Sequence, residues 1–246
     1  MSSNSLCAYL DWDSSFFKKR IARVTLNRLS SETTRTILQW CSENLIECLY
    51  FLCDSDHAET VALCELNEFH LVDIRVTMNI QPGTVSPSAK RKSEKLIILR
   101  DYEENDRLTL EAIAQNNHID SRFYYDSNFP RAFCDKLYGA WLEKSCQNQA
   151  GKVFVAEMQN QAVGYITCGK NSDNEAAIGL LGVSPQAQGH GIGQLLINAS
   201  INWAQAEKIT RLSVVTQGRN VKAQRAYQKC GFQTVEVKLW YHKWFQ

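Results

Sequence analysis

The sequence of 246 residues lacks several features that would assign it to common protein classes. Its nine cysteines form no C-x-x-C pair, so the paired ligands of a zinc site are missing. No stretch approaches the roughly 20 apolar residues of a membrane-spanning helix, and the first residues do not form a secretory signal. We therefore expect a cytoplasmic protein without a metal site, whose thiols are reduced and mostly buried.

An excess of charge of either sign is also missing. The 27 Lys and Arg residues nearly balance 26 Asp and Glu residues, which gives a formal net charge of +1. No overall field would attract nucleic acid or an anionic membrane, so neither is an expected partner. Basic residues do cluster at 90–92, and we interpret that cluster as a solubilising feature of a Ser-rich segment.

Segment 81–95 divides the chain. It contains two prolines and a glycine, and no hydrophobic period runs through it, which is typical of a linker. The sequence thus predicts an α/β domain over residues 1–80 and a second domain over residues 96–246. In the second domain, the periodicities predict the order β-α-α-β-β-β-α-β-α-β, which is a mixed α/β sheet.

The first domain repeats the element order found at the end of the chain. Its patterns predict helix, strand, helix and strand at 32–44, 49–53, 58–66 and 70–80. The separation between Trp40 and Phe69 in the sequence equals that between Trp203 and Phe232. This equal spacing favours an internal half-repeat, with a chance match of two aromatics as the alternative.

The most informative motif joins an apolar strand to an amphipathic helix over residues 180–196. Gln188, Gly191 and Gly193 give the pattern Q-x-x-G-x-G. Glycines let the backbone turn tightly and bring its N–H groups close to a ligand. The following helix N-terminus adds unsatisfied N–H groups and a partial positive charge. Such a loop can bind a pyrophosphate, although its glycine order differs from that of dinucleotide-binding units and no P-loop motif is present.

A second block runs from Asn220 to Phe232 and reads N-x-x-A-x-x-x-Y-x-x-x-G-F. Together, the two blocks resemble the GNAT superfamily of N-acetyltransferases over about residues 96–240. The resemblance implies the GNAT fold, an α/β fold in which a mixed, twisted sheet has splayed central strands. Here it would be preceded by a smaller α/β domain that resembles a degenerate GNAT half. The resemblance also implies acetyl-CoA as acetyl donor.

Short motifs across nearly the whole chain resemble, more narrowly, the dTDP-fucosamine acetyltransferase family. They include W-D-S-S-F-F at 12–17, S-R-F-Y-Y-D at 121–126 and T-Q-G-R-N at 216–220. This resemblance implies direct attack of a nucleotide-linked deoxyamino sugar on acetyl-CoA, in the synthesis of surface polysaccharide precursors. The alternatives are a peptide N-terminal acetyltransferase and a non-catalytic acyl-CoA-binding module. A homodimer is compatible with the sequence, which identifies neither the sugar nor the nucleotide.

The resemblance also assigns roles to individual residues. The expected cofactor-binding residues lie on the strand edge, the glycine loop and the last helix: Leu181, Gly182, Val183, Gln188, Gly189, His190, Gly191, Ile192, Gly193, Asn220 and Ala223. Asn220 could also be the N-cap of the helix that starts at Val221, and the His190 side chain could simply face solvent. Tyr227 is the expected catalytic residue, because a phenol can protonate the departing thiolate of CoA; its alternative role is packing.

The acceptor site is expected along segment 120–130. Arg122 or Arg131 suits a diphosphate because a guanidinium binds it through two hydrogen bonds. The aromatic side chains of this segment, Tyr124 among them, could stack on a base or sugar. Alternatively, they pack the segment onto the sheet.

No general base stands out in the sequence. The candidates are Asp126, Glu157, His118 and a chain of water molecules. A covalent route through Cys230 is conceivable, but nothing in the sequence marks a lowered thiol pKa, so burial is the preferred interpretation.

The register of the half-repeat places Asn220 on His57 and Tyr227 on Cys64. No Q-x-x-G-x-G motif precedes Trp40. We therefore expect the N-terminal domain to bind no acetyl-CoA. Its strands should instead extend or abut the C-terminal sheet and help to wall the acceptor site.

Overall fold

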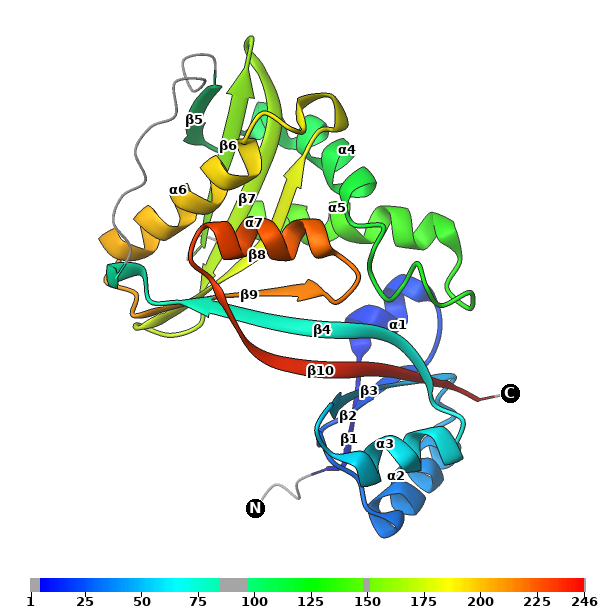
Figure 1. The fold of residues 1–246 in the computed structure, drawn as a ribbon. Helices are drawn as coiled ribbons and strands as arrows, with labels where there is room; N and C mark the ends of the chain where they lie inside the picture. The colour runs from blue at the N-terminus through cyan, green and yellow to red at the C-terminus, as the bar shows by residue number, and fades with distance from the viewer. Residues whose placement is uncertain (1–4, 85–96, 148–150, 246) are drawn as a thin grey trace.

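A computed structural model describes residues 5–84, 97–147 and 151–245. It contains ten strands: β1 (Cys7–Tyr9), β2 (Ile21–Val24), β3 (Cys48–Asp54), β4 (His70–Ile80), β5 (Ile97–Asp101), β6 (Gly151–Met158), β7 (Gln161–Lys170), β8 (Glu175–Val183), β9 (Arg211–Gln217) and β10 (Gln233–Trp244). All ten form one twisted, mixed sheet in the order β1-β2-β3-β10-β4-β9-β8-β7-β6-β5 (Figure 1).

Seven α-helices in the described part of the chain cover this sheet. They are α1 (Asp11–Phe17), α2 (Ser31–Glu43), α3 (Ala58–Leu66), α4 (Arg107–Asn117), α5 (Arg131–Gln147), α6 (Ile192–Ala206) and α7 (Val221–Lys229). The predicted mixed α/β class is therefore confirmed. The elements predicted from residue 96 onward are all present, whereas β1, α1 and β2 were not predicted.

The side chains of β3 alternate between the two faces of the sheet and pack into a different apolar core on each face. Leu49 and Phe51 belong to the apolar cluster under α2 and α3, while Cys48 and Tyr50 belong to the cluster that contains residues of α1, α4 and α5. Successive side chains of a strand point to opposite faces, so one strand supplies both cores. A third cluster joins α6 and α7 to the sheet beside β4 and β9.

The parallel strands β8 and β9 diverge. Their pairing ends at Ile178 and Val214, although β8 continues to Val183 and β9 to Gln217. On its other side, β8 stays paired with β7 as far as Val183. Beyond Ile178, the edge of β8 that faces β9 therefore has no strand partner, and an opening forms in the sheet.

Each half of the chain places one strand between two strands of the other half. Strand β10 lies between β3 and β4, and β4 lies between β10 and β9 (Figure 1). Leu49 pairs with Lys243, and Leu212 pairs with Ile80. In the sequence, Leu49 is as far from Leu212 as Ile80 is from Lys243, so the two pairings are equivalent under the half-repeat. The expectation that N-terminal strands extend the C-terminal sheet is thus confirmed.

The division into domains 1–80 and 96–246 stays a prediction, as does the half-repeat. Most of the predicted linker 81–95 lies outside the described residues. The equivalent strand pairings support the half-repeat. The helix ends agree too: in α3 the His57 side chain accepts the Thr60 N–H, and in α7 the Asn220 side chain accepts the Ala223 N–H.

Candidate active site

The glycine loop before α6 has the geometry of an anion cradle. Gly189 and Gly191 have φ angles of 85° and 82°, in the left-handed region that other residues rarely adopt. A Cβ added at Gly189, Gly191 or Gly193 would meet no heavy atom within 4 Å. No side chain caps the N-terminus of α6, so its first N–H groups fit a pyrophosphate placed in this space.

Side chains around the loop hold its shape and add charge. Gln188 donates from Nε2 to the Val183 carbonyl over 3.2 Å, and its Oε1 accepts a hydrogen bond from Lys222. A ring nitrogen of His190 lies 3.2 Å from the Ala187 carbonyl, within the loop itself. Sequence reasoning missed Lys222, whose only signal was its place just after Asn220. It brings a cation beside the predicted anion site.

The residues predicted on α7 lie close to the opening between β8 and β9. Asn220 is the N-cap of α7, because its Oδ1 accepts the Ala223 N–H over 3.0 Å. Tyr227 is 4% exposed and its ring centroid is 5.5 Å from that of Phe232. Burial raises the pKa of Tyr227 well above its usual range, so the phenol keeps its proton at neutral pH.

A pocket of about 340 Å³ lies at this opening and reaches both faces of the sheet. On one side it is lined by Asn220, Ala223 and Tyr227 of α7. On the other side it is lined by residues of α4, α5, the segment between these helices and β4. The pocket thus brings together Tyr227 and Arg122, which the sequence assigned to the donor and acceptor sites. Leu181 of the predicted strand edge also lines it, whereas Gly182 and Val183 do not.

The two predicted acceptor residues differ in position. The guanidinium carbon of Arg122 is 4.1 Å from the ring centroid of Trp240, inside the pocket. Tyr124 does not line the pocket: its hydroxyl donates to Asp135 over 2.8 Å, and Arg131 lies 4.5 Å from its ring centroid. Arg122 thus lines the pocket, whereas Tyr124 and Arg131 do not, and the acceptor role of each stays a prediction.

Two of the three candidate bases are engaged elsewhere. Burial opposes ionisation of Asp126, but hydrogen bonds from His242 and Trp244 outweigh burial and lower its pKa to about 2. Glu157 pairs with Arg100 over 2.7 Å. Neither carboxylate lines the pocket.

His118 does line the pocket, and its ring stacks on Tyr138 with centroids 4.3 Å apart. Burial lowers the pKa of His118 to about 4, so the imidazole is neutral at physiological pH. Burial likewise raises the pKa of the Cys230 thiol to about 11. The thiolate that a covalent route needs is therefore scarce.

A further carboxylate, Asp73 of β4, escaped the sequence analysis. It is 4% exposed and lines the pocket. Burial raises the pKa of Asp73 to about 6, although Arg219 lies 3.7 Å away. The signal was weak: Asp73 and Arg75 alternate with apolar residues in a strand assigned to the other half of the chain. Through Asp73, β4 contributes to the wall of this pocket.

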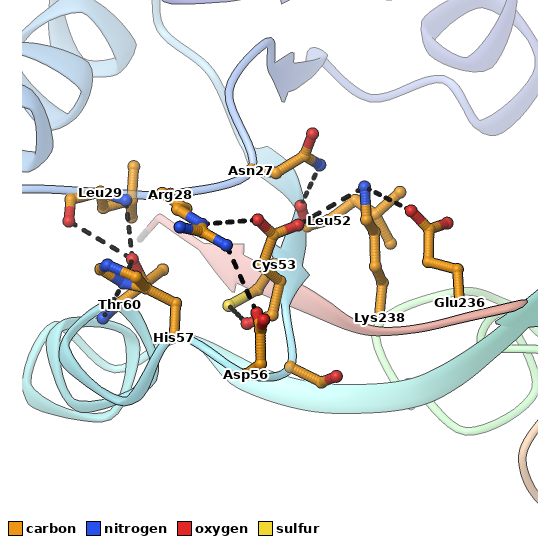
Figure 2. Close-up of polar contacts among 12 residues, drawn as sticks. Asn27, Arg28, Leu29, Leu52, Cys53, Asp56, His57, Thr60, Glu236 and Lys238 are labelled. Atoms are coloured by element: carbon orange, nitrogen blue, oxygen red, sulfur yellow. Dashed lines mark hydrogen bonds and ion pairs between the residues drawn. The ribbon is translucent and has the colours of Figure 1, made fainter.

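The equivalent position in the N-terminal half offers no anion cradle. The Thr60 hydroxyl accepts the Leu29 N–H over 2.8 Å, at the place that corresponds to the start of α6 (Figure 2). Arg28 pairs with Asp54 over 2.7 Å and with Asp56 over 3.5 Å. The Arg28 guanidinium is therefore engaged by two carboxylates. That this half binds no acetyl-CoA stays a prediction.

Comparison with known proteins shows the family. The model of the acetyltransferase (GNAT) family matches residues 107–232, which include the glycine loop and Tyr227. The chain belongs to this family and is an acetyltransferase. A solved GCN5-related N-acetyltransferase from Sphaerobacter thermophilus has a TM-score of 0.71 at 14% identity, covering 97% of this chain and 76% of that one. The predicted GNAT fold is thus confirmed.

Two curated relatives match almost the entire chain. The spore coat polysaccharide biosynthesis protein SpsD of Bacillus subtilis is 22% identical over 241 residues, which are 95% of this chain and 81% of the relative. The dTDP-fucosamine acetyltransferase of Escherichia coli O6:H1 is 25% identical over 240 residues, covering 95% of this chain and 96% of the relative.

Within the described residues, no helix is long and apolar enough to span a bilayer.

Proposed function

We propose that the chain transfers acetyl from acetyl-CoA to the amino group of a nucleotide-linked deoxyamino sugar. The observation that carries this proposal is the pocket through the sheet. It connects Tyr227, on the face of the glycine loop, with Arg122 and Asp73 on the opposite face. The names of the two full-length relatives, which concern a spore coat polysaccharide and a dTDP-linked amino sugar, favour the same acceptor class.

In this proposal, acetyl-CoA lies along the opening between β8 and β9. Backbone N–H groups of residues 188–193 bind its pyrophosphate, and Lys222 adds a positive charge beside Gln188. The edge of β8 at residues 181–183, which has no strand partner on the side of β9, binds the amides of the pantetheine arm. Asn220 and Ala223 contact the same arm from α7. The cofactor supplies the thioester whose acetyl group is transferred.

The proposed reaction needs one proton acceptor and one donor. The neutral amine attacks the thioester carbonyl, so that a C–N bond forms and the C–S bond breaks. The Asp73 carboxylate removes the proton of the amine, directly or through water. Tyr227 donates its proton to the departing sulfur, and its raised pKa keeps that proton available.

Two measurements test the proposal. Mass spectrometry on a panel of dTDP- and UDP-amino sugars should reveal acetylated products, whereas peptides with a free N-terminus should stay unmodified. Isothermal titration should give one acetyl-CoA site per chain, because only the C-terminal half has the loop. Acetylation of peptides alone would replace the proposal by a peptide N-terminal acetyltransferase. Tight acetyl-CoA binding without any acetylated product would replace it by a non-catalytic acyl-CoA-binding module. A second site would contradict the degenerate N-terminal half.

Replacing Asp73 by Asn is expected to lower kcat/KM by about 10²- to 10⁴-fold, the usual contribution of a positioned base. In the parent protein, kcat/KM should fall as the pH drops below about 6, where Asp73 gains a proton. The variant should lose this inflection. Asp135→Asn, which changes a carboxylate outside the pocket, should keep it. An unchanged inflection in Asp73→Asn would exclude Asp73 as the base.

The same variant should be more stable than the parent at pH 7.5, by on the order of 1 kcal/mol. The folded-state pKa of Asp73 lies above the usual value. Folding therefore loses stability as the pH rises from about 4 to about 6. An Asn side chain does not ionise, so the variant avoids this loss of stability. Thermal unfolding of the parent and the variant at pH 4 and 7.5 measures the difference.

A further inference from the structure

Two arginines of the pocket, Arg75 and Arg122, have buried polar atoms without partners. The Nε atoms of both side chains are buried and form no hydrogen bond within the described residues. Neither guanidinium takes part in any ion pair found in residues 5–84, 97–147 and 151–245. Buried donors normally find partners in native proteins. Two such cations lining one pocket therefore point to an anionic ligand.

The surroundings of Arg122 fix its orientation. Its guanidinium carbon lies 4.1 Å from the ring centroid of Trp240, 4.4 Å from that of Phe123 and 4.7 Å from that of Tyr50. Aromatic faces attract a cation but offer no acceptor lone pair to its N–H groups. The packing thus holds the planar fork in place and leaves its hydrogen-bonding capacity for a ligand.

Arg75 lies on β4, between its neighbours Lys238 of β10 and Gln217 of β9 in the sheet register. Burial is the main cause that lowers the pKa of Arg75, and the charge of Arg122 adds to it. The charge of Glu236 acts in the opposite direction on the pKa of Arg75, but Glu236 forms no ion pair with Arg75. Glu236 pairs with Lys238, which also pairs with Asp54. The carboxylate nearest in sequence, Asp73, accepts the Ile74 N–H and faces Arg219.

We propose that Arg75 and Arg122 form an anion subsite that binds the sugar-proximal phosphate of the acceptor. The inference rests on the proposed function and deepens it. Because the subsite shares a pocket with Tyr227, the proposal places the amine and the anion on one small molecule. A guanidinium pair binds a phosphate or a carboxylate through similar double hydrogen bonds. The N-terminal half thereby supplies a determinant of acceptor specificity, Arg75.

Arg75→Gln provides the main test. It should raise KM for a dTDP-amino sugar by at least about 10-fold, since charge-assisted hydrogen bonds are lost, and leave KM for acetyl-CoA unchanged. Arg122→Gln should act in the same direction, but it also removes packing against three rings. Arg75→Gln should not lower the melting temperature, because the parent side chain is a half-buried cation whose buried Nε has no hydrogen-bond partner. Arg131→Gln, outside the pocket, is the matched control.

Three acceptors test whether the bound anion is a phosphate or a carboxylate. They are an amino sugar linked to a nucleoside diphosphate, an amino sugar acid with a carboxylate, and a neutral amino sugar. The proposal expects the sugar nucleotide to lose its advantage over the neutral sugar in Arg75→Gln. A carboxylate acceptor that alone responds to Arg75→Gln would overturn the assignment to phosphate. An equal kcat/KM for all three acceptors in the parent protein would overturn the subsite.

A binding experiment separates this proposal from the acetyltransfer reaction. Pyrophosphate is titrated into protein saturated with CoA, so that the glycine loop is occupied. The parent and Arg131→Gln should bind pyrophosphate, and Arg75→Gln should bind it at least about 10-fold more weakly. Equal binding by all three proteins would contradict the subsite. If no amine is acetylated in any assay, the proposed function fails, and this titration still decides the subsite.

Discussion

Replacing Tyr227 by Phe is expected to lower kcat by on the order of 10²-fold or more and to leave acetyl-CoA affinity unchanged. The buried ring packs against Phe232 at 5.5 Å between centroids, and Phe preserves this packing. Only the hydroxyl is lost, and with it the proton donor for the departing sulfur. Steady-state kinetics and titration with acetyl-CoA measure the two quantities.

Tyr241→Phe is the matched control for this variant. Tyr241 is also buried, and its hydroxyl donates to Glu65 in the N-terminal half. Its loss should affect stability but not turnover. If Tyr227→Phe turns over at the parent rate while a single-turnover experiment shows that chemistry limits kcat, Tyr227 has no part in the mechanism.

Replacing Gly191 by Val is expected to weaken acetyl-CoA binding by on the order of 10²-fold, through the loss of charge-assisted hydrogen bonds to the pyrophosphate. A β-branched residue is strained at the φ of 82° found here. Its side chain would also occupy the open space beside the loop. Isothermal titration gives the dissociation constant, and circular dichroism shows whether the variant is folded.

Gly169→Val separates these effects from a general cost of adding a side chain. Gly169 lies on β7, has ordinary backbone angles, and an added Cβ would meet nothing within 4 Å. We expect this control to bind acetyl-CoA like the parent. Parent-like affinity in a folded Gly191→Val protein would mean that the loop is not the pyrophosphate site.

The donor side of the site could be predicted from the sequence because its signals are local. The glycines, α6 and α7 follow one another in a single stretch of the chain, and their motif and helical period are read directly from the sequence. By contrast, β1, α1 and β2 have three, seven and four residues. Such short segments do not establish a period, so they were missed.

Apart from Arg122, the acceptor side of the pocket could not be predicted, because distant pairings create it. Asp73 and Arg75 enter the pocket only because β4 pairs with β9, which lies in the opposite half of the sequence. Likewise, Asp126 was a reasonable candidate base until its hydrogen bond with His242 placed it in the interior. No local pattern in the sequence reveals that β4 pairs with β9 or that Asp126 bonds to His242.

The position of β10 also affects how the protein is made. This strand follows every other described strand in the sequence, yet it fills the space between β3 and β4. Until the ribosome has released it, a nascent chain exposes one edge of each of these two strands, and unpaired edges can join to those of other chains. Pairings between residues so far apart in sequence also form slowly. The first half of the chain therefore depends on the last strand to complete its sheet, and premature termination would leave both halves unfinished.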